Sequence, residues 1–232
     1  MPAERGRSAA EGPQCAAVLL AGGTGSRLGG AEKALLRRGS TTLLRAWLAA
    51  LAGRSIDVAV VGPSHLRPQL DAPELSPRTA AAPGPKVLLT REDPPLSGPA
   101  AGVASGVRTL AAAELLPREG HVLLLAVDTV DPALLLDWLQ GFAPEPGRGV
   151  LPADAAGREQ RLASMVDAAA LRRTVEALAP GEEAGWPLRR LLEGLAVDRP
   201  RLPAGLGRDV DTPADAAALG VEIPDAERGR PL

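Results

Sequence analysis

The segment CAAVLLAGGTGSRLGGAEK, residues 15–33, decides the fold. It opens with Cys15–Leu20, a continuous apolar run that is typical of a strand buried on both faces. Glycines follow this run at once and end the strand. In an open α/β sheet, ligands bind beyond the carboxyl ends of the strands. The segment therefore predicts a buried first strand that leads directly into a ligand-binding loop.

The rest of the chain alternates between strand and helix patterns. Apolar runs predict strands at 56–61, 86–90 and 121–127, and residues 149–154 and 160–167 could pair as strands. Helices are predicted at 42–51, 99–116, 131–139, 168–178, 186–195 and 213–219. Such alternation predicts an α/β protein with a mostly parallel sheet that helices cover on both faces. We expect one domain over residues 15–220, an irregular stretch over 71–85, and tails over 1–14 and 221–232.

The composition excludes several classes of protein. The 232 residues carry a formal net charge of −2, and the aromatic share of 2% is too small for stacking on bases, which argues against a nucleic-acid partner. A single cysteine excludes an internal disulfide framework and, with two histidines, most zinc sites built from Cys and His. No apolar run is long enough to span a membrane, and residues 1–14 lack the apolar core of a secretory signal. We therefore expect a soluble, cytoplasmic protein.

The glycine-rich loop is predicted to bind phosphate. Glycines let backbone N–H groups approach phosphate oxygens closely, and Arg27 and Lys33 add positive charge. A P-loop is disfavoured because Lys33 is preceded by Glu32 and followed by Ala34. A dinucleotide-binding turn is disfavoured less firmly, because Gly29-Gly30 would interrupt its helix. A glycine-rich turn without a ligand is the alternative. The candidate nucleotide contacts in this loop are Leu20, Ala21, Gly22, Gly23, Thr24, Gly25, Ser26 and Lys33.

The same loop resembles the signature of the molybdenum cofactor guanylyltransferases, the MobA-like NTP transferases. In that family the loop wraps the triphosphate of a nucleotide, and the lysine that matches Lys33 neutralises the reacting phosphates. Residues 92–102 resemble the family's next loop, in which an acidic residue before a Gly-Pro pair contacts the nucleotide. Asp93 is the best match, with Glu92 as the alternative, and Gly98 begins the Gly-Pro pair. The resemblance covers residues 16–219 and implies a Rossmann-like three-layer α/β/α fold of the nucleotide-diphospho-sugar transferase type.

Two further segments follow the family's order and imply a metal site. Residues 123–129 resemble the strand whose terminal aspartate, here Asp128, binds magnesium, although a loop or cap role for Asp128 is the alternative. Residues 208–215 resemble a late motif that usually has asparagine at Asp209 and often at Asp211. An extended backbone points these two carboxylates to one side, where they repel unless a cation or an arginine such as Arg208 lies between them. Asp128, Asp209 and Asp211 are therefore the candidate ligands of Mg²⁺, which suits an all-oxygen site.

Other polar residues are predicted to be structural. Asp131 before Pro132 has the pattern of a helix N-cap followed by proline. Thr212 and Asp215 have the spacing of a capping box. Cys15 begins an apolar strand and is expected to pack in the core.

The resemblance implies a reaction. An acceptor phosphate attacks the α-phosphorus of GTP, pyrophosphate leaves, and Lys33, Arg27 and Asp128 carry the catalysis by positioning and neutralising charge. The implied acceptor is molybdopterin, with molybdoenzymes or cofactor-biosynthesis proteins as partners. The alternatives are cytidylyl transfer to molybdopterin, guanylyl transfer to a phosphorylated hydroxy acid, or a non-catalytic nucleotide-binding protein of the same fold. The chain departs from the family at Val130, where proline is usual, at Gly62, where some members have asparagine, and in residues 160–166, which lack a common proline.

Overall fold

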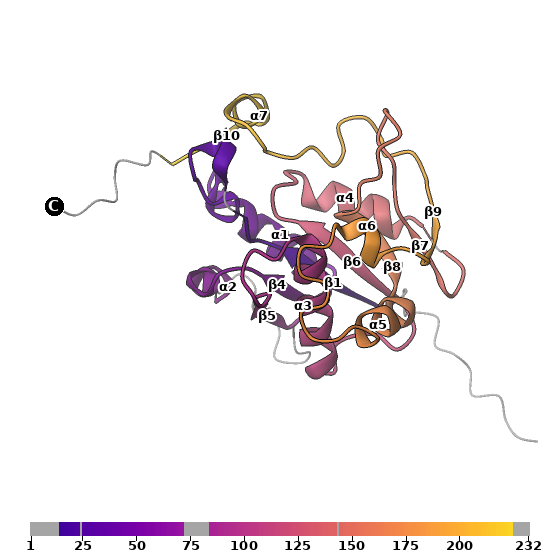
Figure 1. Ribbon diagram of the computed structural model, residues 1–232. Coiled ribbons are helices and arrows are strands. Elements are labelled where there is room, and N and C mark those ends of the chain that lie inside the picture. Colours follow the sequence, from indigo (N-terminus) through magenta and orange to yellow (C-terminus); the bar gives the residue numbers. More distant parts are fainter. Residues whose placement is uncertain (1–13, 24, 72–83, 143, 225–232) are drawn as a thin grey trace, which may run out of the picture.

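A computed structural model describes residues 14–23, 25–71, 84–142 and 144–224. Thr24, nearly all of the predicted N-terminal tail, and most of the predicted irregular stretch and C-terminal tail lie outside these ranges. The main sheet has seven strands in the order β5-β4-β1-β6-β8-β7-β9 (Figure 1). Strands β5, β4, β1 and β6 run parallel, and β8 is antiparallel to both β6 and β7. The strands are β1 Cys15–Leu20, β4 Asp57–Val61, β5 Val87–Thr90, β6 His121–Ala126, β7 Arg148–Val150, β8 Ala163–Asp167 and β9 Ala196–Asp198.

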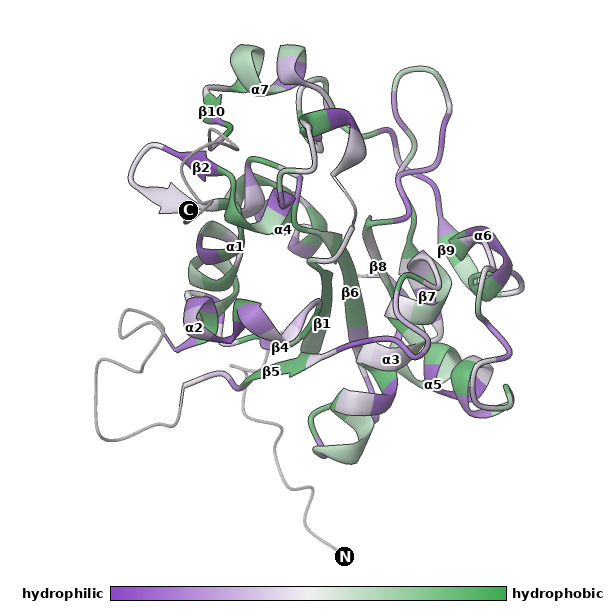
Figure 2. Cartoon of the chain, turned by 60° about the vertical axis from the view of Figure 1, so that its left-hand side comes forward, coloured by the Kyte–Doolittle hydropathy of each residue, from purple (hydrophilic) through white to green (hydrophobic). Residues whose placement is uncertain are grey.

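Both faces of the central strands are buried, which explains their continuous apolar sequences. In β1, Ala17 and Leu19 face one core cluster, and Ala16 and Val18 face the other. Helices α1 (Leu43–Ala52) and α4 (Pro132–Gln140) cover the first face. Helices α3 (Pro99–Ala112), α5 (Ala168–Glu176) and α6 (Leu188–Leu191) cover the second. Figure 2 shows the hydrophobic colour of β1 and β6 between these layers, which confirms the predicted three-layer α/β/α fold.

The remaining elements are short. They are the 3₁₀ helices η1 Ser26–Leu28, η2 Lys33–Leu35 and η3 Ser64–Leu66, the helices α2 Arg67–Leu70 and α7 Pro213–Leu219, and the strands β2 Arg37–Arg38, β3 Thr41–Thr42 and β10 Val221–Glu222. The three strands form a second sheet in the order β10-β2-β3, so the chain continues in regular structure two residues beyond the predicted end of the domain. No helix in the described ranges has the length and apolar character needed to cross a membrane.

Close packing of α3 on the sheet depends on its glycines. A Cβ atom on Gly106 would lie 2.5 Å from Cγ1 of Val18, and one on Gly102 would lie 3.0 Å from Cδ2 of Leu20. The absence of these side chains lets the helix approach β1. Since α3 begins near the carboxyl ends of the parallel strands, this contact also positions the first residues of the helix.

Several predicted boundaries were wrong for identifiable reasons. The helix predicted at 186–195 is reduced to α6, because Pro187 precedes it and Gly194 adopts a φ of 83°, and the chain then forms β9. Helix α3 ends at Ala112 and not at residue 116, since Glu114 has a φ of 59°. The predicted pair 149–154 and 160–167 forms only as Val150 with Met165, plus an isolated bridge further along.

Of the two predicted helix caps, one is confirmed and the other is wrong. Thr212 and Asp215 form the predicted capping box at the start of α7. Asp131 precedes α4 but makes no side-chain cap, because its carboxylate instead accepts a hydrogen bond of 2.7 Å from Arg38 Nη1. Cys15 is partly buried, and burial raises the pKa of its thiol to about 11, which fits the predicted packing role.

Candidate functional site

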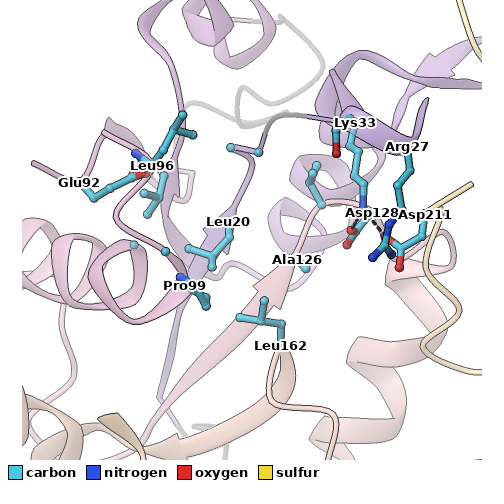
Figure 3. Close-up of a pocket in the computed structure, with 18 residues that line it drawn as sticks. Leu20, Arg27, Lys33, Glu92, Leu96, Pro99, Ala126, Asp128, Leu162 and Asp211 are labelled. Atoms are coloured by element: carbon cyan, nitrogen blue, oxygen red, sulfur yellow. Dashed lines mark hydrogen bonds and ion pairs between the residues drawn. The ribbon is translucent and has the colours of Figure 1, made fainter. Parts of the chain in front are cut away.

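A cavity of about 530 Å³ lies beyond the carboxyl ends of β1, β4 and β6. The glycine loop, the loop before α3 and the end of β6 contribute its walls, and Leu162 closes it from the start of the β8 segment. Figure 3 shows Lys33, Arg27, Asp128 and Asp211 together at one end, and it shows Glu92, Leu96 and Pro99 at the other. The cavity therefore has one strongly charged end and one largely apolar end with a single carboxylate.

The charged end is organised around Lys33. Its Nζ donates hydrogen bonds of 2.6 Å to Asp128 Oδ2 and 2.5 Å to Asp211 Oδ1. Only 24% of the Lys33 side chain and 18% of the Asp128 side chain are exposed, whereas Asp211 is half exposed. Burial by itself lowers the pKa of Lys33, but the two carboxylates outweigh it and hold that pKa above its usual value. One ammonium group thus joins three segments that are far apart in the sequence.

The glycine loop takes a shape that only glycine permits at Gly25. This residue has a φ of 54°, and a Cβ atom on it would lie 2.0 Å from the carbonyl oxygen of Ala31. Its own carbonyl oxygen accepts hydrogen bonds from the backbone N–H groups of Leu28, at 2.8 Å, and Gly30, at 3.0 Å. The resulting tight turn carries the chain around one wall of the cavity before Lys33 enters it. The predicted contacts that line the cavity here are Leu20, Gly22, Gly23, Gly25, Ser26, Arg27 and Lys33.

Among the described candidate nucleotide contacts of this loop, Ala21 is the one that does not line the cavity. It is 2% exposed, and its backbone N–H donates a hydrogen bond of 2.8 Å to Val61 in β4. Ala21 therefore supports the loop from behind. Thr24 lies outside the described residues.

The loop before α3 places Glu92 in the cavity, and Asp93 does not line it. Glu92 Oε1 accepts a hydrogen bond of 2.9 Å from the backbone N–H of Leu96, which fixes the carboxylate. Leu96 lines the same end with 63% of its surface exposed and a φ of 65°. Gly98, also in the wall as predicted, has a φ of 92° and leads into α3. The alternative acidic residue is therefore the one at the cavity.

Asp209 lies beside the charged end and does not line the cavity. Its Oδ1 accepts a hydrogen bond of 2.8 Å from Thr129 Oγ1. Although part of the residue is exposed, burial of the carboxyl group and repulsion from Asp128 raise its pKa to about 6. Arg208 was the alternative cation for these aspartates, but its Nη2 atom lies 3.8 Å from Asp131 Oδ2. The cation that contacts Asp211 is Lys33.

Carboxylates at the charged end already face a cation, the Lys33 ammonium group. Within the described ranges, no group of three or more His, Cys, Asp or Glu side chains is placed to hold a metal ion. The oxygen donors of Asp128 and Asp211 are nevertheless the type that Mg²⁺ takes, together with phosphate oxygens of a substrate. The carboxylate oxygens of Asp128 and Asp211 are therefore chemically suited to bind Mg²⁺.

Sequence reasoning missed several wall residues. All of them are apolar residues or glycine, and they lie at the ends of strands, in the loop before α3, in the first turns of α3 and just before β8. They are Val61, Leu96, Pro99, Gly102, Ala126, Val127 and Leu162. The position after each strand could have identified Val61, Ala126 and Val127, since strand ends meet at one edge. Gly62, where some family members have asparagine, is packed so that a Cβ would lie 3.0 Å from Leu66 Cδ1.

A family model of the MobA-like NTP transferase domain matches residues 17–201. The chain belongs to this family. The predicted family assignment is therefore confirmed, and the chain is a nucleotidyltransferase-family protein. A search of curated protein sequences finds no significant match.

Solved structures support the same fold. A homologue of Mycobacterium tuberculosis Rv0371c from Mycobacterium sp. strain JC1 has a TM-score of 0.60 at 23% identity, covering 89% of this chain and 94% of that one. A 4-diphosphocytidyl-2C-methyl-D-erythritol synthase has a TM-score of 0.59 at 16% identity, covering 90% and 98%. A nucleoside-diphosphate-sugar pyrophosphorylase from Vibrio cholerae RC9 has a TM-score of 0.57 at 14% identity, covering 88% and 99%. At these identities the similarity shows the nucleotidyltransferase-like Rossmann-type fold and does not identify the base or the acceptor.

Proposed function

We propose that this protein transfers GMP from GTP to a phosphorylated acceptor, with molybdopterin as the acceptor, and releases pyrophosphate. The observation that carries this proposal is the charged end of the cavity, where Lys33 lies between Asp128 and Asp211 next to the glycine loop. Membership of the MobA-like family supports the class of reaction. The product would pass to molybdoenzymes or to other proteins of cofactor biosynthesis in the cytoplasm.

The two different ends of the cavity favour one orientation of a bound nucleotide. The triphosphate belongs at the charged end, where the backbone N–H groups of the glycine loop, Arg27 and Lys33 offer donors and positive charge. The base belongs at the other end, between Leu96, Pro99 and the Glu92 carboxylate (Figure 3). Guanine presents two adjacent N–H donors that a carboxylate accepts together, and this chemistry favours GTP.

The chain's residues catalyse the transfer by holding charge in place. An oxygen of the acceptor phosphate forms a bond to the α-phosphorus while the bond to the β-phosphate oxygen breaks, and pyrophosphate leaves with that electron pair. Lys33 and Arg27 reduce the repulsion between the two anions and stabilise the charge that develops on the leaving group. Asp128 and Asp211 would hold Mg²⁺, with Asp209 beside them, and the ion would supply further neutralisation of phosphate charge.

Cytidylyl transfer is the second candidate. One structure of the same fold is titled a 4-diphosphocytidyl-2C-methyl-D-erythritol synthase. The Glu92 carboxylate could also accept the amino group of cytosine, although it then binds one donor in place of two.

The test is pyrophosphate release measured with each of the four nucleoside triphosphates, Mg²⁺ and a panel of phosphorylated acceptors that includes molybdopterin. We expect release with GTP and molybdopterin and a much lower rate with the other bases. Release with CTP alone would replace the first candidate by the second. Tight nucleotide binding with no release under any condition would favour a non-catalytic nucleotide-binding protein.

A further inference from the structure

An acidic residue directly precedes the lysine of the charged end. Glu32 is the one acidic residue in the sequence of segment 20–33, and Lys33 follows it. Lys33 lines the nucleotide cavity, whereas Glu32 does not. The segment that we propose to bind a triphosphate thus carries one negative charge, and a negative charge close to the phosphates would repel them.

His65 holds the Glu32 carboxylate outside the cavity. Nε2 of His65 lies 2.7 Å from Glu32 Oε2 and 2.9 Å from Glu32 Oε1. Because an ionised carboxylate can only accept hydrogen bonds, Nε2 of the imidazole is the donor, and both oxygens share it. The His65 side chain is 59% exposed and that of Glu32 is 26% exposed, and His65 is not part of the cavity wall. The contact therefore fixes the carboxylate on the outer side of the glycine loop.

The backbone around His65 is fixed without its imidazole. His65 lies in η3, shortly after Val61, which ends β4 and lines the cavity. Leu66 is fully buried, and its backbone N–H donates a hydrogen bond of 3.1 Å to the carbonyl of Pro63. Loss of the imidazole should therefore change the contact with Glu32 and leave the segment after β4 in place.

The orientation of Glu32 bears directly on Lys33. The backbone carbonyl of Glu32 accepts a hydrogen bond of 2.9 Å from the N–H of Leu35, which begins the turn of η2. Within this turn the Lys33 side chain reaches into the cavity, and the Glu32 side chain reaches His65. Without His65 the carboxylate would gain rotamer freedom, and it could turn toward the Lys33 ammonium group or toward bound phosphates.

We propose that His65 is a positioning residue that keeps the Glu32 carboxylate away from the bound triphosphate. This inference rests on the proposed placement of the triphosphate at the charged end. His65 touches no reacting atom, and its effect passes through Glu32 to the phosphates beside Lys33. The charged end already contains Asp128 and Asp211, so a third free carboxylate there would weaken the binding of an anion.

The test is a calorimetric titration in the presence of Mg²⁺ with two probes, inorganic tripolyphosphate and an analogue of GTP with a methylene group between its α- and β-phosphorus atoms. His65→Ala should bind both probes about threefold more weakly than the wild type at low ionic strength, which is the size expected for an exposed charged contact. The loss should shrink at high salt, because salt screens exposed charges. His65→Gln, whose amide can also donate to Glu32, should keep the affinity of the wild type. Thermal melts verify that each variant is folded.

A second substitution separates an electrostatic effect from a purely structural one. In the His65→Ala background, Glu32→Gln removes the freed charge and should restore the affinity for both probes. Glu176→Gln in the same background removes an exposed charge on α5 outside the cavity wall, and as the matched control it should restore nothing.

Two results would overturn the inference alone. They are undiminished affinity in His65→Ala and a loss of affinity that Glu32→Gln does not repair. If the wild type binds neither probe, the proposed triphosphate site is wrong, and the inference about His65 is wrong with it.

Discussion

Lys33 connects the sequence motif to the chemistry, because its ammonium group lies between two carboxylates from distant segments. The chain has one other lysine, Lys86, which is exposed and does not line the cavity. Arginine could carry the charge, but a compact ammonium fits between two carboxylates that each lie within 2.6 Å of it. Lys33 therefore supplies the compact cation that this position needs.

Lys33→Ala should reduce turnover by about 10²–10³-fold, as loss of a preorganised donor at a reacting phosphate typically does. The melting temperature should change little, because Asp211 is half exposed and water can reach the carboxylates that lose their partner. Pyrophosphate release and a thermal melt measure the two effects. Lys86→Ala is the control and should match the wild type in both. Unchanged turnover in Lys33→Ala would remove this residue from the site.

Asp128→Asn should greatly increase the magnesium concentration needed for activity. The amide keeps the size and one oxygen of the side chain but loses the charge that attracts a hard cation. The measurement is turnover across a magnesium titration, with nucleotide affinity determined separately without metal. Asp209→Asn is the matched control, with at most a modest loss, because an amide oxygen can still accept the hydrogen bond of Thr129. Identical magnesium curves for wild type and Asp128→Asn would show that Asp128 is not a ligand.

At the scale of elements, the contact between α3 and β1 positions the loop that carries Glu92. Gly106→Val should destabilise the protein by about 1–3 kcal/mol, because the added side chain would overlap Val18 in a packed core. Chemical denaturation measures this change in the free energy of unfolding. Ala112→Val, at the exposed last residue of the same helix, controls for the helix propensity of valine and should cost less than about 0.5 kcal/mol. Equal losses in both variants would mean that the close packing contributes nothing.

The segment before α6 supports the same loop through a partly buried ion pair. Arg108 Nη1 of α3 donates a hydrogen bond of 2.5 Å to Glu183, whose side chain is 4% exposed. Two residues further on, the backbone N–H of Gly185 donates a hydrogen bond of 2.8 Å to the carbonyl of Ser97, next to Gly98 in the cavity wall. Burial disfavours the charged Glu183, but the hydrogen bonds from Arg108 and from its own backbone outweigh this and hold its pKa below the usual value.

The lowered pKa of Glu183 determines how the stability of the folded protein changes with pH. The ion pair stabilises the folded protein fully above the unfolded-state pKa of about 4.5 and loses this contribution as the pH falls through the lower folded-state pKa. Glu183→Gln should therefore cost about 2 kcal/mol at neutral pH and less in acid. Denaturation at a series of pH values tests this, with the exposed Glu176→Gln as control. A constant difference between Glu183→Gln and the wild type down to strong acid would contradict the prediction.

The elements that were predictable are those with a periodic or continuous pattern. Strands β1, β4 and β6 are apolar except for Asp57 and His121 at the first positions of β4 and β6, because helices cover both faces of these strands. Strand β5 is apolar up to its last residue, Thr90. The capping box of Thr212 and Asp215 is also visible in the sequence. The strands β2, β3, β9 and β10 span only two or three residues each and show no pattern of their own. They form because other segments of the fold offer them partners, which no local sequence encodes.

At the scale of the whole molecule, the parallel sheet brings the site together. The sequence predicted Lys33 and Asp128 at the same edge because each follows a buried strand. The sequence could not decide whether Glu92 or Asp93 lies at the cavity, since the position of the Glu92 carboxylate depends on the hydrogen bond that it accepts from the backbone N–H of Leu96. It also could not show that Asp211 contacts Lys33 or that Asp209 contacts Thr129, because these pairings depend on how the C-terminal segment returns across the sheet edge.

The central claim is that the charged end of this cavity binds the triphosphate of a nucleotide as its magnesium complex. The most direct measurement is a calorimetric titration of the wild type and of Lys33→Ala with the α,β-methylene analogue of GTP, with and without Mg²⁺. We predict one saturable site in the wild type that is strengthened by Mg²⁺, and affinity at least about tenfold lower in Lys33→Ala, which corresponds to about 1.4 kcal/mol. No saturable binding to the wild type, or equal affinity in both proteins, would contradict the claim.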